Sequence, residues 1–169
     1  MAAEDEFAAF CRIELPRLVG AIGLYCGDAH VAEEIAQEAL ARVWRKWRTV
    51  SAARAPGAYA QRTAINLANS YYRRKRAERR AAAMLTPPSV VVDADVGDRL
   101  VVRRALADLS QRQRAVLVLR YYLGYTVDET AAALGLAPGT VMSNSMRGLE
   151  RMRRSLGSSV SVREVSRLA

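Results

Sequence analysis

The 169-residue chain has few of the residues that build disulfide frameworks and metal sites. Its two cysteines, Cys11 and Cys26, are too few for a disulfide framework, so we expect free thiols in a reducing cytoplasm. The single histidine is His30, and no cysteine or histidine pair has the spacing of a zinc site. A phosphate-binding glycine loop and a dinucleotide fingerprint are also missing. We therefore expect no catalytic residue, no metal and no cofactor.

Long apolar segments are missing as well. No stretch reaches the roughly 18 uninterrupted apolar residues that a membrane span needs. The first residues, MAAEDEF, are acidic, whereas a secretory signal begins with basic residues. We expect no membrane insertion and a cytoplasmic location. Apolar residues still make up 51% of the chain, which is enough for a core and excludes wholesale disorder.

Positive charge is what the chain has in excess. Its 26 basic and 17 acidic side chains give a net charge of +9, which is typical of a protein that binds a polyanion such as nucleic acid. The excess is unevenly placed along the chain. The net charge is −6 over residues 1–40, +11 over 41–80, −1 over 81–110 and +5 over 111–169. Two separate basic regions predict two contacts with one polyanion, or two separate polyanion sites.

The sequence predicts an all-α fold. Ala, Leu, Arg and Glu dominate, and alternation with a period of two residues is nearly absent. Helical periodicity extends over residues 7–25, 31–48, 58–83, 100–109, 111–123, 127–134 and 138–156. In the second and third of these helices one side is apolar and is expected to be buried. Its residues are Val31, Ile35, Leu40, Val43, Trp44, Trp47, Ala60, Ala64, Leu67 and Tyr71.

Two prolines divide the chain into two small helical domains. Pro87 and Pro88 cannot continue a helix, and the composition changes around them. We predict four segments: a first domain over residues 1–83, a flexible linker over 84–98, a second domain over 99–157 and a C-terminal tail over 158–169.

The second domain has the layout of a helix-turn-helix, which places its second helix in the major groove of DNA. Ser110 is expected to cap the helix over 111–123 and Thr126 the short helix after it, a turn follows at residues 135–137, and Pro138 begins a longer helix. Ala131 and Gly135 are small where the two helices are expected to cross. The side chains expected to face DNA are Thr140, Ser143, Asn144, Arg147 and Arg151. A plain helical hairpin is the alternative.

The basic middle of the chain carries a second candidate surface. On the helix predicted over 58–83, cations, an aromatic ring and an amide share one side. This combination suits single-stranded nucleic acid, because a ring stacks on an unpaired base while cations follow the phosphates. The residues of that side are Tyr59, Arg62, Asn66, Ser70 and Arg73; Arg74 belongs to the basic run that follows, and Arg54 to the preceding loop. A solvated basic surface without a ligand is the alternative.

A third surface is acidic. Glu34, Gln37 and Glu38 lie three or four residues apart, so they form one polar stripe on their helix. An acidic stripe does not bind DNA. It indicates either a protein partner or plain exposure to solvent.

These blocks, in this order, resemble the extracytoplasmic-function (ECF) sigma factors of bacterial RNA polymerase, a small two-domain class. The segments EEIAQEALARVWRKW and AYAQRTAINLANSYYRRKR resemble sigma region two. The segment LADLSQRQRAVLVLRYYLGYTVDETAAALGLAPGTV resembles region four. The resemblance covers residues 7–83 and 98–156.

The resemblance implies a role for each surface. The stripe of Glu34, Gln37 and Glu38 corresponds to the part that docks on core RNA polymerase. The loop 50–56 and the face around Arg62 correspond to the part that captures bases of the melted −10 promoter element. The helix that begins at Pro138 corresponds to the −35 reader. Core polymerase, promoter DNA and an anti-sigma factor are the implied partners, and no reaction is catalysed.

Several positions depart from the family pattern. Met142 and Asn144 stand where members often carry Lys or Arg, which predicts a weaker −35 contact. Ser70 stands where Asp is frequent, and Pro56-Gly57 occupies a loop that often holds aromatic residues. Two rival functions fit the residues: a helix-turn-helix regulator that is independent of polymerase, and an adaptor that binds polymerase without promoter specificity.

Overall fold

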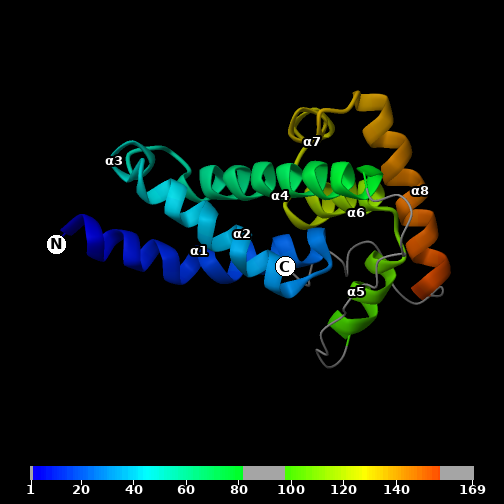
Figure 1. Ribbon diagram of the computed structural model, residues 1–169, viewed down its shortest axis with the longest axis horizontal. Coiled ribbons are helices and arrows are strands. Elements are labelled where there is room, and N and C mark those ends of the chain that lie inside the picture. Colours follow the sequence, from blue (N-terminus) through cyan, green and yellow to red (C-terminus); the bar gives the residue numbers. More distant parts are fainter. Residues whose placement is uncertain (1, 82–97, 157–169) are drawn as a thin grey trace. The chain divides into compact units, whose positions relative to one another are not determined.

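The computed structural model describes residues 2–81 and 98–156 (Figure 1). Its helices are α1 (Ala2–Cys26), α2 (Ala29–Trp44), α3 (Trp47–Val50), α4 (Pro56–Ala81), α5 (Asp98–Ala107), α6 (Gln111–Leu117), the π-helix η1 (Val118–Tyr122), α7 (Val127–Leu134) and α8 (Pro138–Leu156). No strand occurs within these two stretches, and the all-α prediction is confirmed. The predicted tail and the predicted linker, apart from Asp98, lie outside the described residues.

The described helices form two compact units. The first combines α1 up to Gly23 with α2, α3 and α4, and the second combines residues 24–28 with α5 to α8. In the first unit α2 packs against α4. Ala39 on α2 and Ala64 on α4 are fully buried, and such small side chains let two helices approach closely. Ile65 is buried beside them, whereas Leu67 and Tyr71 are only half-buried.

The helix predicted over residues 31–48 is interrupted. α2 ends at Trp44, and a turn follows in which the Lys46 N–H donates to the Val43 carbonyl at 2.9 Å. Trp47 then begins α3 and is buried, as predicted. Trp44 was predicted to be buried, but 42% of it is exposed. Trp44 is the last residue of α2, and its ring is covered in part by Phe7 of α1, with ring centres 4.8 Å apart.

α1 begins five residues before the predicted start and continues through Pro16. It buries Glu14, whose Oε1 accepts a hydrogen bond from Arg17 Nη1 at 3.1 Å. The carboxylate lies against the start of α4, because a Cβ at Gly57 would come within 2.9 Å of Oε1. A negative charge beside a helix N-terminus is stabilised by the helix dipole. Gly57 therefore leaves room for Glu14, which accounts for a glycine at the second residue of α4. Pro56-Gly57 was predicted to lie in a loop, but both residues belong to α4.

The second unit contains the predicted helix-turn-helix, formed by α7 and α8 (Figure 1). Ser110 and Thr126 each form a capping box at the start of α6 and α7, which confirms both predicted caps. In the turn, the Leu136 N–H donates to the Ala131 carbonyl at 3.0 Å. Gly135 has a φ of 63°, the left-handed conformation that glycine adopts most easily.

Close packing between helices requires a glycine at Gly148, and not at Gly135 as predicted. No atom lies within 4 Å of the place where a Cβ would stand at Gly135, so the turn and not a helix crossing requires glycine there. A Cβ at Gly148 on α8 would stand 3.1 Å from Leu117 Cδ1 on α6. The absence of a side chain at Gly148 therefore lets α8 pack closely against α6.

The helix predicted over 111–123 changes type partway. α6 ends at Leu117 and continues as η1, where the Leu123 N–H donates to the Val118 carbonyl at 3.0 Å, five residues back. This wider turn brings the Tyr121 hydroxyl within 3.1 Å of Ser145 Oγ on α8. η1 therefore adds a polar contact to the packing that holds the recognition helix.

Candidate nucleic-acid interface

One side of α4, called here the α4 face, carries most residues predicted to hold single-stranded DNA. Its members Tyr59, Arg62, Asn66, Ser70 and Arg73 are all exposed and lie three or four residues apart. The Ser70 hydroxyl donates to the Asn66 carbonyl at 2.9 Å, and Arg73 Nη2 donates to Ser70 Oγ at 3.0 Å. The structure thus brings a ring, an amide and two guanidinium groups to one exposed surface.

The other two predicted cations of this region lie differently. Arg54 is exposed in the loop between α3 and α4. Arg74 leans along its own helix, with Nε 3.6 Å from Glu78 Oε1 and Cζ 5.9 Å from the centre of the Tyr71 ring. Lys75 joins the same cluster, since its Nζ donates to the Tyr71 hydroxyl at 2.9 Å. Arg74 is therefore engaged next to the α4 face and not on it.

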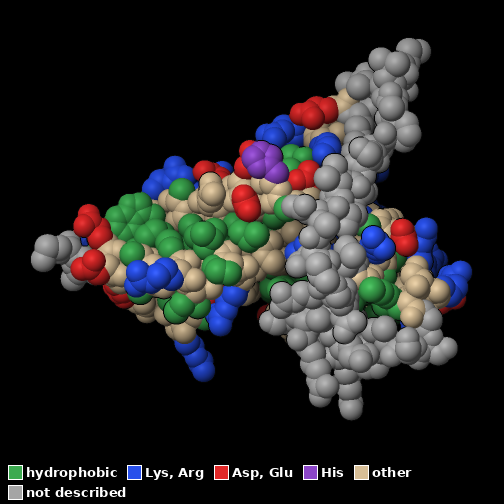
Figure 2. Space-filling model, turned by 90° about the horizontal axis from the view of Figure 1, so that it is seen from below, with side chains coloured by type: hydrophobic (Ala, Val, Ile, Leu, Met, Phe, Trp, Pro, Cys, Tyr) green, Lys and Arg blue, Asp and Glu red, His purple; other side chains and the backbone are tan. Residues whose placement is uncertain are grey.

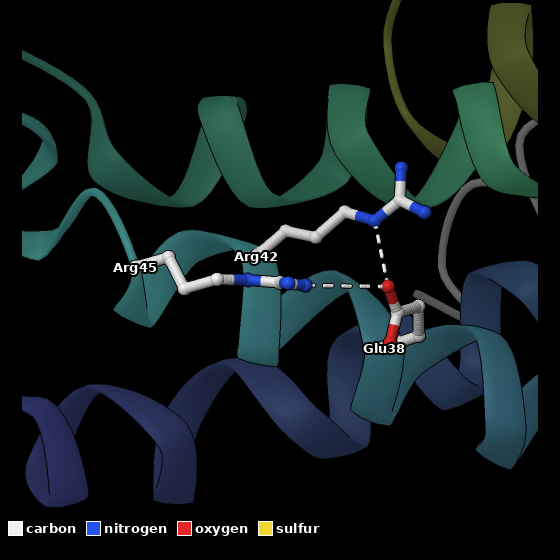
Figure 3. A network of polar contacts seen from close by, with 3 residues as sticks. All are labelled: Glu38, Arg42 and Arg45. Atoms are coloured by element: carbon white, nitrogen blue, oxygen red, sulfur yellow. Dashed lines mark hydrogen bonds and ion pairs between the residues drawn. The ribbon is translucent and has the colours of Figure 1, made fainter.

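The acidic stripe of Glu34, Gln37 and Glu38 is exposed along α2. Figure 3 shows two guanidinium groups converging on one oxygen of Glu38: Arg42 Nε at 2.7 Å and Arg45 Nη2 at 3.5 Å. The hydrogen bond from Arg42 is the main reason why the pKa of Glu38 is lowered, so this carboxylate is charged at neutral pH. Part of the stripe's negative charge is therefore matched by cations of the same helix and the turn after it.

On the recognition helix α8, the residues predicted to face DNA differ in their exposure to solvent. Arg147 and Arg151 are exposed, whereas Thr140, Ser143 and Asn144 are half-buried. The Thr140 carbonyl accepts two side-chain hydrogen bonds, from Ser143 Oγ at 3.1 Å and from Asn144 Nδ2 at 2.7 Å. Two of the predicted DNA-reading groups therefore bind their own backbone in this structure.

Not every basic side chain of the second unit is available to bind DNA. Arg114 is only 8% exposed, and its guanidinium donates to the carbonyls of Leu106, Ala107 and Leu109 at 2.9 to 3.4 Å. These carbonyls lie at and just beyond the end of α5, where a helix leaves acceptors without internal partners. Arg114 therefore holds the end of α5 and is not available to DNA.

Sequence reasoning missed an aromatic cluster in the first unit. Phe7 and Phe10 of α1 meet Trp44 and Trp47: ring centres lie 4.8 Å apart for Phe7–Trp44 and 5.0 Å apart for Phe7–Trp47 and Phe10–Trp47. The signal was present, because each pair has the i, i+3 spacing of neighbours on one helix side. Four rings therefore tie the start of α1 to the turn after α2.

In the part of the chain that the structure describes, residues 2–81 and 98–156, no helix is long and apolar enough to cross a membrane. Nor does it contain a group of three or more His, Cys, Asp or Glu residues placed to hold a metal ion.

Comparison with known proteins identifies both units. The family described as Sigma-70 region 2 matches residues 11–78, and Sigma-70, region 4 matches residues 99–152. The RNA polymerase sigma-E factor of Streptomyces coelicolor is 34% identical over 89% of this chain and 86% of its own length. The ECF RNA polymerase sigma factor SigL of Mycobacterium tuberculosis is 32% identical over 77% of each chain.

A solved structure agrees with these sequence matches. The sigma factor RpoE, crystallised with the anti-sigma factor NepR from Bartonella quintana, superposes with a TM-score of 0.70 at 25% identity, over 89% of this chain and 96% of its own. The chain belongs to the sigma-70 family, as an ECF RNA polymerase sigma factor with regions two and four.

Proposed function

We propose that this sigma factor divides promoter-specific initiation among three of its surfaces. The stripe on α2 docks on core RNA polymerase, the α4 face captures the melted −10 strand, and α8 reads the duplex −35 element. The exposed ring, amide and guanidinium groups that share one side of α4 carry this proposal, because they suit unpaired bases and phosphates together.

Capture on the α4 face works by binding and involves no bond-breaking step. Taking a base out of the duplex costs a few kcal/mol, and stacking returns about 1–3 kcal/mol per base. Tyr59 offers the exposed ring, Asn66 an amide for a base edge, and Arg62 a charge for the backbone. The chain therefore stabilises the melted state of the promoter, and polymerase performs the chemistry.

Reading of the −35 element by α8 requires a rearrangement. Arg147 and Arg151 are exposed and can reach guanine or phosphate directly. Ser143 and Asn144 first have to leave the Thr140 carbonyl. Exchanging these internal hydrogen bonds for contacts to bases lowers the net gain, so we propose that α8 contributes less to promoter affinity than the α4 face.

Docking on polymerase involves the exposed stripe of α2. Gln37 supplies an amide beside the two carboxylates, and a basic surface on the partner would share Glu38 with Arg42 and Arg45. Polymerase and chromosomal DNA are in the cytoplasm of bacteria, and we place the action of this chain there.

An anti-sigma factor is a further proposed partner. The Bartonella quintana relative was crystallised with one. Met142 and Met146 of this chain are 61% and 69% exposed on α8, and adjacent apolar side chains suit a protein contact. Replacing both by Ser should weaken binding of the cognate anti-sigma factor while core-polymerase affinity stays unchanged. Equal affinity of the variant and the wild type for the anti-sigma factor would show that Met142 and Met146 are not part of the contact.

Reconstitution tests the proposed function against its rivals. The purified chain, added to core polymerase, should give transcripts that start at one promoter position and require both the −35 and −10 elements. Binding to a symmetric operator without polymerase would instead support the independent regulator. Binding to polymerase without specific initiation would support the adaptor.

A further inference from the structure

A buried acidic side chain lies in the first unit. On the face drawn in Figure 2, acidic and basic side chains stand at the surface, where water solvates them. Glu14 on α1 differs, because only 6% of it is exposed. Arg17 donates to its Oε1, but Oε2 is buried and accepts no hydrogen bond from the part of the chain that the structure describes. An apolar side chain of the same size would avoid the cost of this unpaired oxygen, so packing alone does not explain a carboxylate here.

The start of α4 supplies an explanation. The Oε1, Cδ and Oε2 atoms of Glu14 lie 2.9, 3.2 and 3.3 Å from the place where a Cβ would stand at Gly57. The whole carboxylate therefore lies against the second residue of α4. The first N–H groups of a helix have no acceptor inside it, and the helix dipole makes this end positive. A carboxylate is the group that this end attracts, and an apolar side chain would not replace it.

This contact lies next to the first member of the α4 face. Tyr59 comes two residues after Gly57, in the first turn of α4. Its N–H donates to the Ala55 carbonyl at 3.4 Å, longer than the roughly 2.9–3.0 Å that is typical, so the backbone alone holds this turn weakly. Helix ends open more readily than helix centres. A turn that is fixed before DNA arrives loses less entropy on binding.

We propose that Glu14 is a positioning residue for capture of the −10 strand, because its carboxylate fixes the first turn of α4 and with it the ring of Tyr59. Glu14 is buried, so it acts through α4 and does not touch DNA itself. The proposal rests on the proposed function, because the position of this turn matters only if the α4 face binds the melted strand. The glycine at position 57 follows from the same arrangement, since a side chain there would displace the carboxylate.

Gly57→Ala removes the contact with little disturbance of the fold. Its methyl would stand 2.9 Å from Oε1 of Glu14, and the atom that has to move is the end of a flexible side chain. The experiment uses holoenzyme, reconstituted from this chain and core polymerase, and a promoter template with a premelted −10 region. Affinity for this template should fall about tenfold, as expected for loss of a partly buried charge at a helix end, while core-polymerase affinity matches the wild type. Gly23→Ala is the matched control, because its Cβ would meet Ala32 Cβ at an ordinary 3.8 Å, and it should change neither value.

A second substitution should restore the contact. Aspartate is one CH₂ group shorter than glutamate, so Glu14→Asp draws the carboxylate back and leaves room for a methyl group at position 57. Glu14→Asp combined with Gly57→Ala should therefore recover most of the lost template affinity. Glu14→Gln keeps the size of the side chain without its charge and should lose about as much affinity as Gly57→Ala. Glu6→Gln, which changes an exposed acid of the same helix, is the control and should have no effect.

Three results would overturn this role of Glu14. The first is wild-type template affinity in both Gly57→Ala and Glu14→Gln. The second is no recovery when Glu14→Asp is added to Gly57→Ala. The third is a matching loss of core-polymerase affinity, which would mean that Glu14 holds the whole unit together, because α2 packs against α4 in that unit. None of these results touches the proposed function, whose failure shows differently: the wild-type chain would then give no promoter-specific transcript.

Discussion

The α4 face and the recognition helix α8 differ in how they present the groups proposed to bind DNA. On α4, Tyr59, Arg62 and Asn66 are exposed. On α8, Ser143 and Asn144 are half-buried and donate hydrogen bonds to the Thr140 carbonyl. The difference teaches that a basic stretch of sequence does not by itself provide exposed side chains that are free to contact nucleic acid.

Packing explains part of this difference. α4 buries a narrow column of small residues, which include Ala60, Ala64 and Ala68, so its opposite side remains free. α8 has to pack on α5, α6 and α7, and its side buries Val141, Ser145, Gly148 and Met152. A helix that packs against three neighbours has less of its circumference left for DNA.

The largest expected effect comes from disturbing the packing of α8 against α6 at Gly148. Gly148→Ala should destabilise the second unit, because overpacking against the buried Leu117 costs about 1–3 kcal/mol and the helix propensity of alanine, worth up to about 1 kcal/mol, offsets only part of it. Promoter binding through α8 should fall with it, while the first unit keeps its stability. Thermal unfolding of the full chain and binding to −35 duplex within the holoenzyme measure the two effects.

Gly139→Ala is the matched control on the same helix. No atom lies within 4 Å of a Cβ at Gly139, and alanine favours a helix over glycine by up to about 1 kcal/mol. This variant should be as stable as the wild type or more stable. Equal destabilisation by both substitutions would show that packing on α6 is not what holds α8.

An added positive charge on α8 should strengthen its binding to DNA and so reduce the difference from the α4 face. Asn144→Arg removes the amide that bonds to Thr140 and adds a cation on the DNA-facing side. One new phosphate contact should steepen the salt dependence of −35 binding by about 0.9. Affinity measured across a salt series with holoenzyme and a −35 duplex gives this slope.

Met146→Arg adds the same charge in the wrong place. Two residues further along a helix, a side chain points about 200° away, so Arg at Met146 faces away from the groove that position 144 faces. Its salt dependence should match the wild type. An equal change in both variants would mean that total charge, and not the face of α8, determines −35 binding.

The sequence predicted the local features of the second unit well. Ser110 and Thr126 form the expected caps, and Pro138 opens α8, because such signals depend on residues within one helical turn. The family match followed from the order of two long motif blocks. Apart from Arg54 and Arg74, the residues of the three surfaces share their expected helix sides, and the contacts assigned to them stay predictions.

Features that depend on a neighbouring helix were beyond the sequence. Periodicity placed Trp44 on the buried side, but burial depends on how far neighbouring helices cover that side, and 42% of Trp44 stays exposed at the end of α2. Arg114 counted as free charge until the structure placed it on the carbonyls at the end of α5. The hydrogen bond of Asn144 to Thr140 depends on a side-chain rotamer, which a sequence pattern does not specify.

The smallest predicted effect concerns the cap of α7. The Thr126 N–H donates to Glu129 Oε2 at 2.8 Å, and hydrogen bonds with Thr126 lower the pKa of Glu129. A lowered pKa in the folded state means that the charged carboxylate stabilises α7 at neutral pH. This stabilisation is lost as the pH falls below about 4.5 and through the lowered pKa.

Thermal unfolding as a function of pH measures this contribution. Glu129→Ala should melt below the wild type at pH 7, and the difference should shrink as the pH falls toward 3. Asp128→Ala removes an acid from the same helical turn without touching the Thr126 cap, and its difference should change less with pH. A pH-independent deficit for Glu129→Ala would contradict a role for its charge.

The most direct test of the account measures two properties of one variant, Arg62→Ala combined with Asn66→Ala. Both side chains are exposed on α4, so the fold should persist. We predict that core-polymerase affinity matches the wild type, while permanganate reactivity of the −10 region in the promoter complex disappears. Normal melting by this variant would contradict the assignment of base capture to the α4 face.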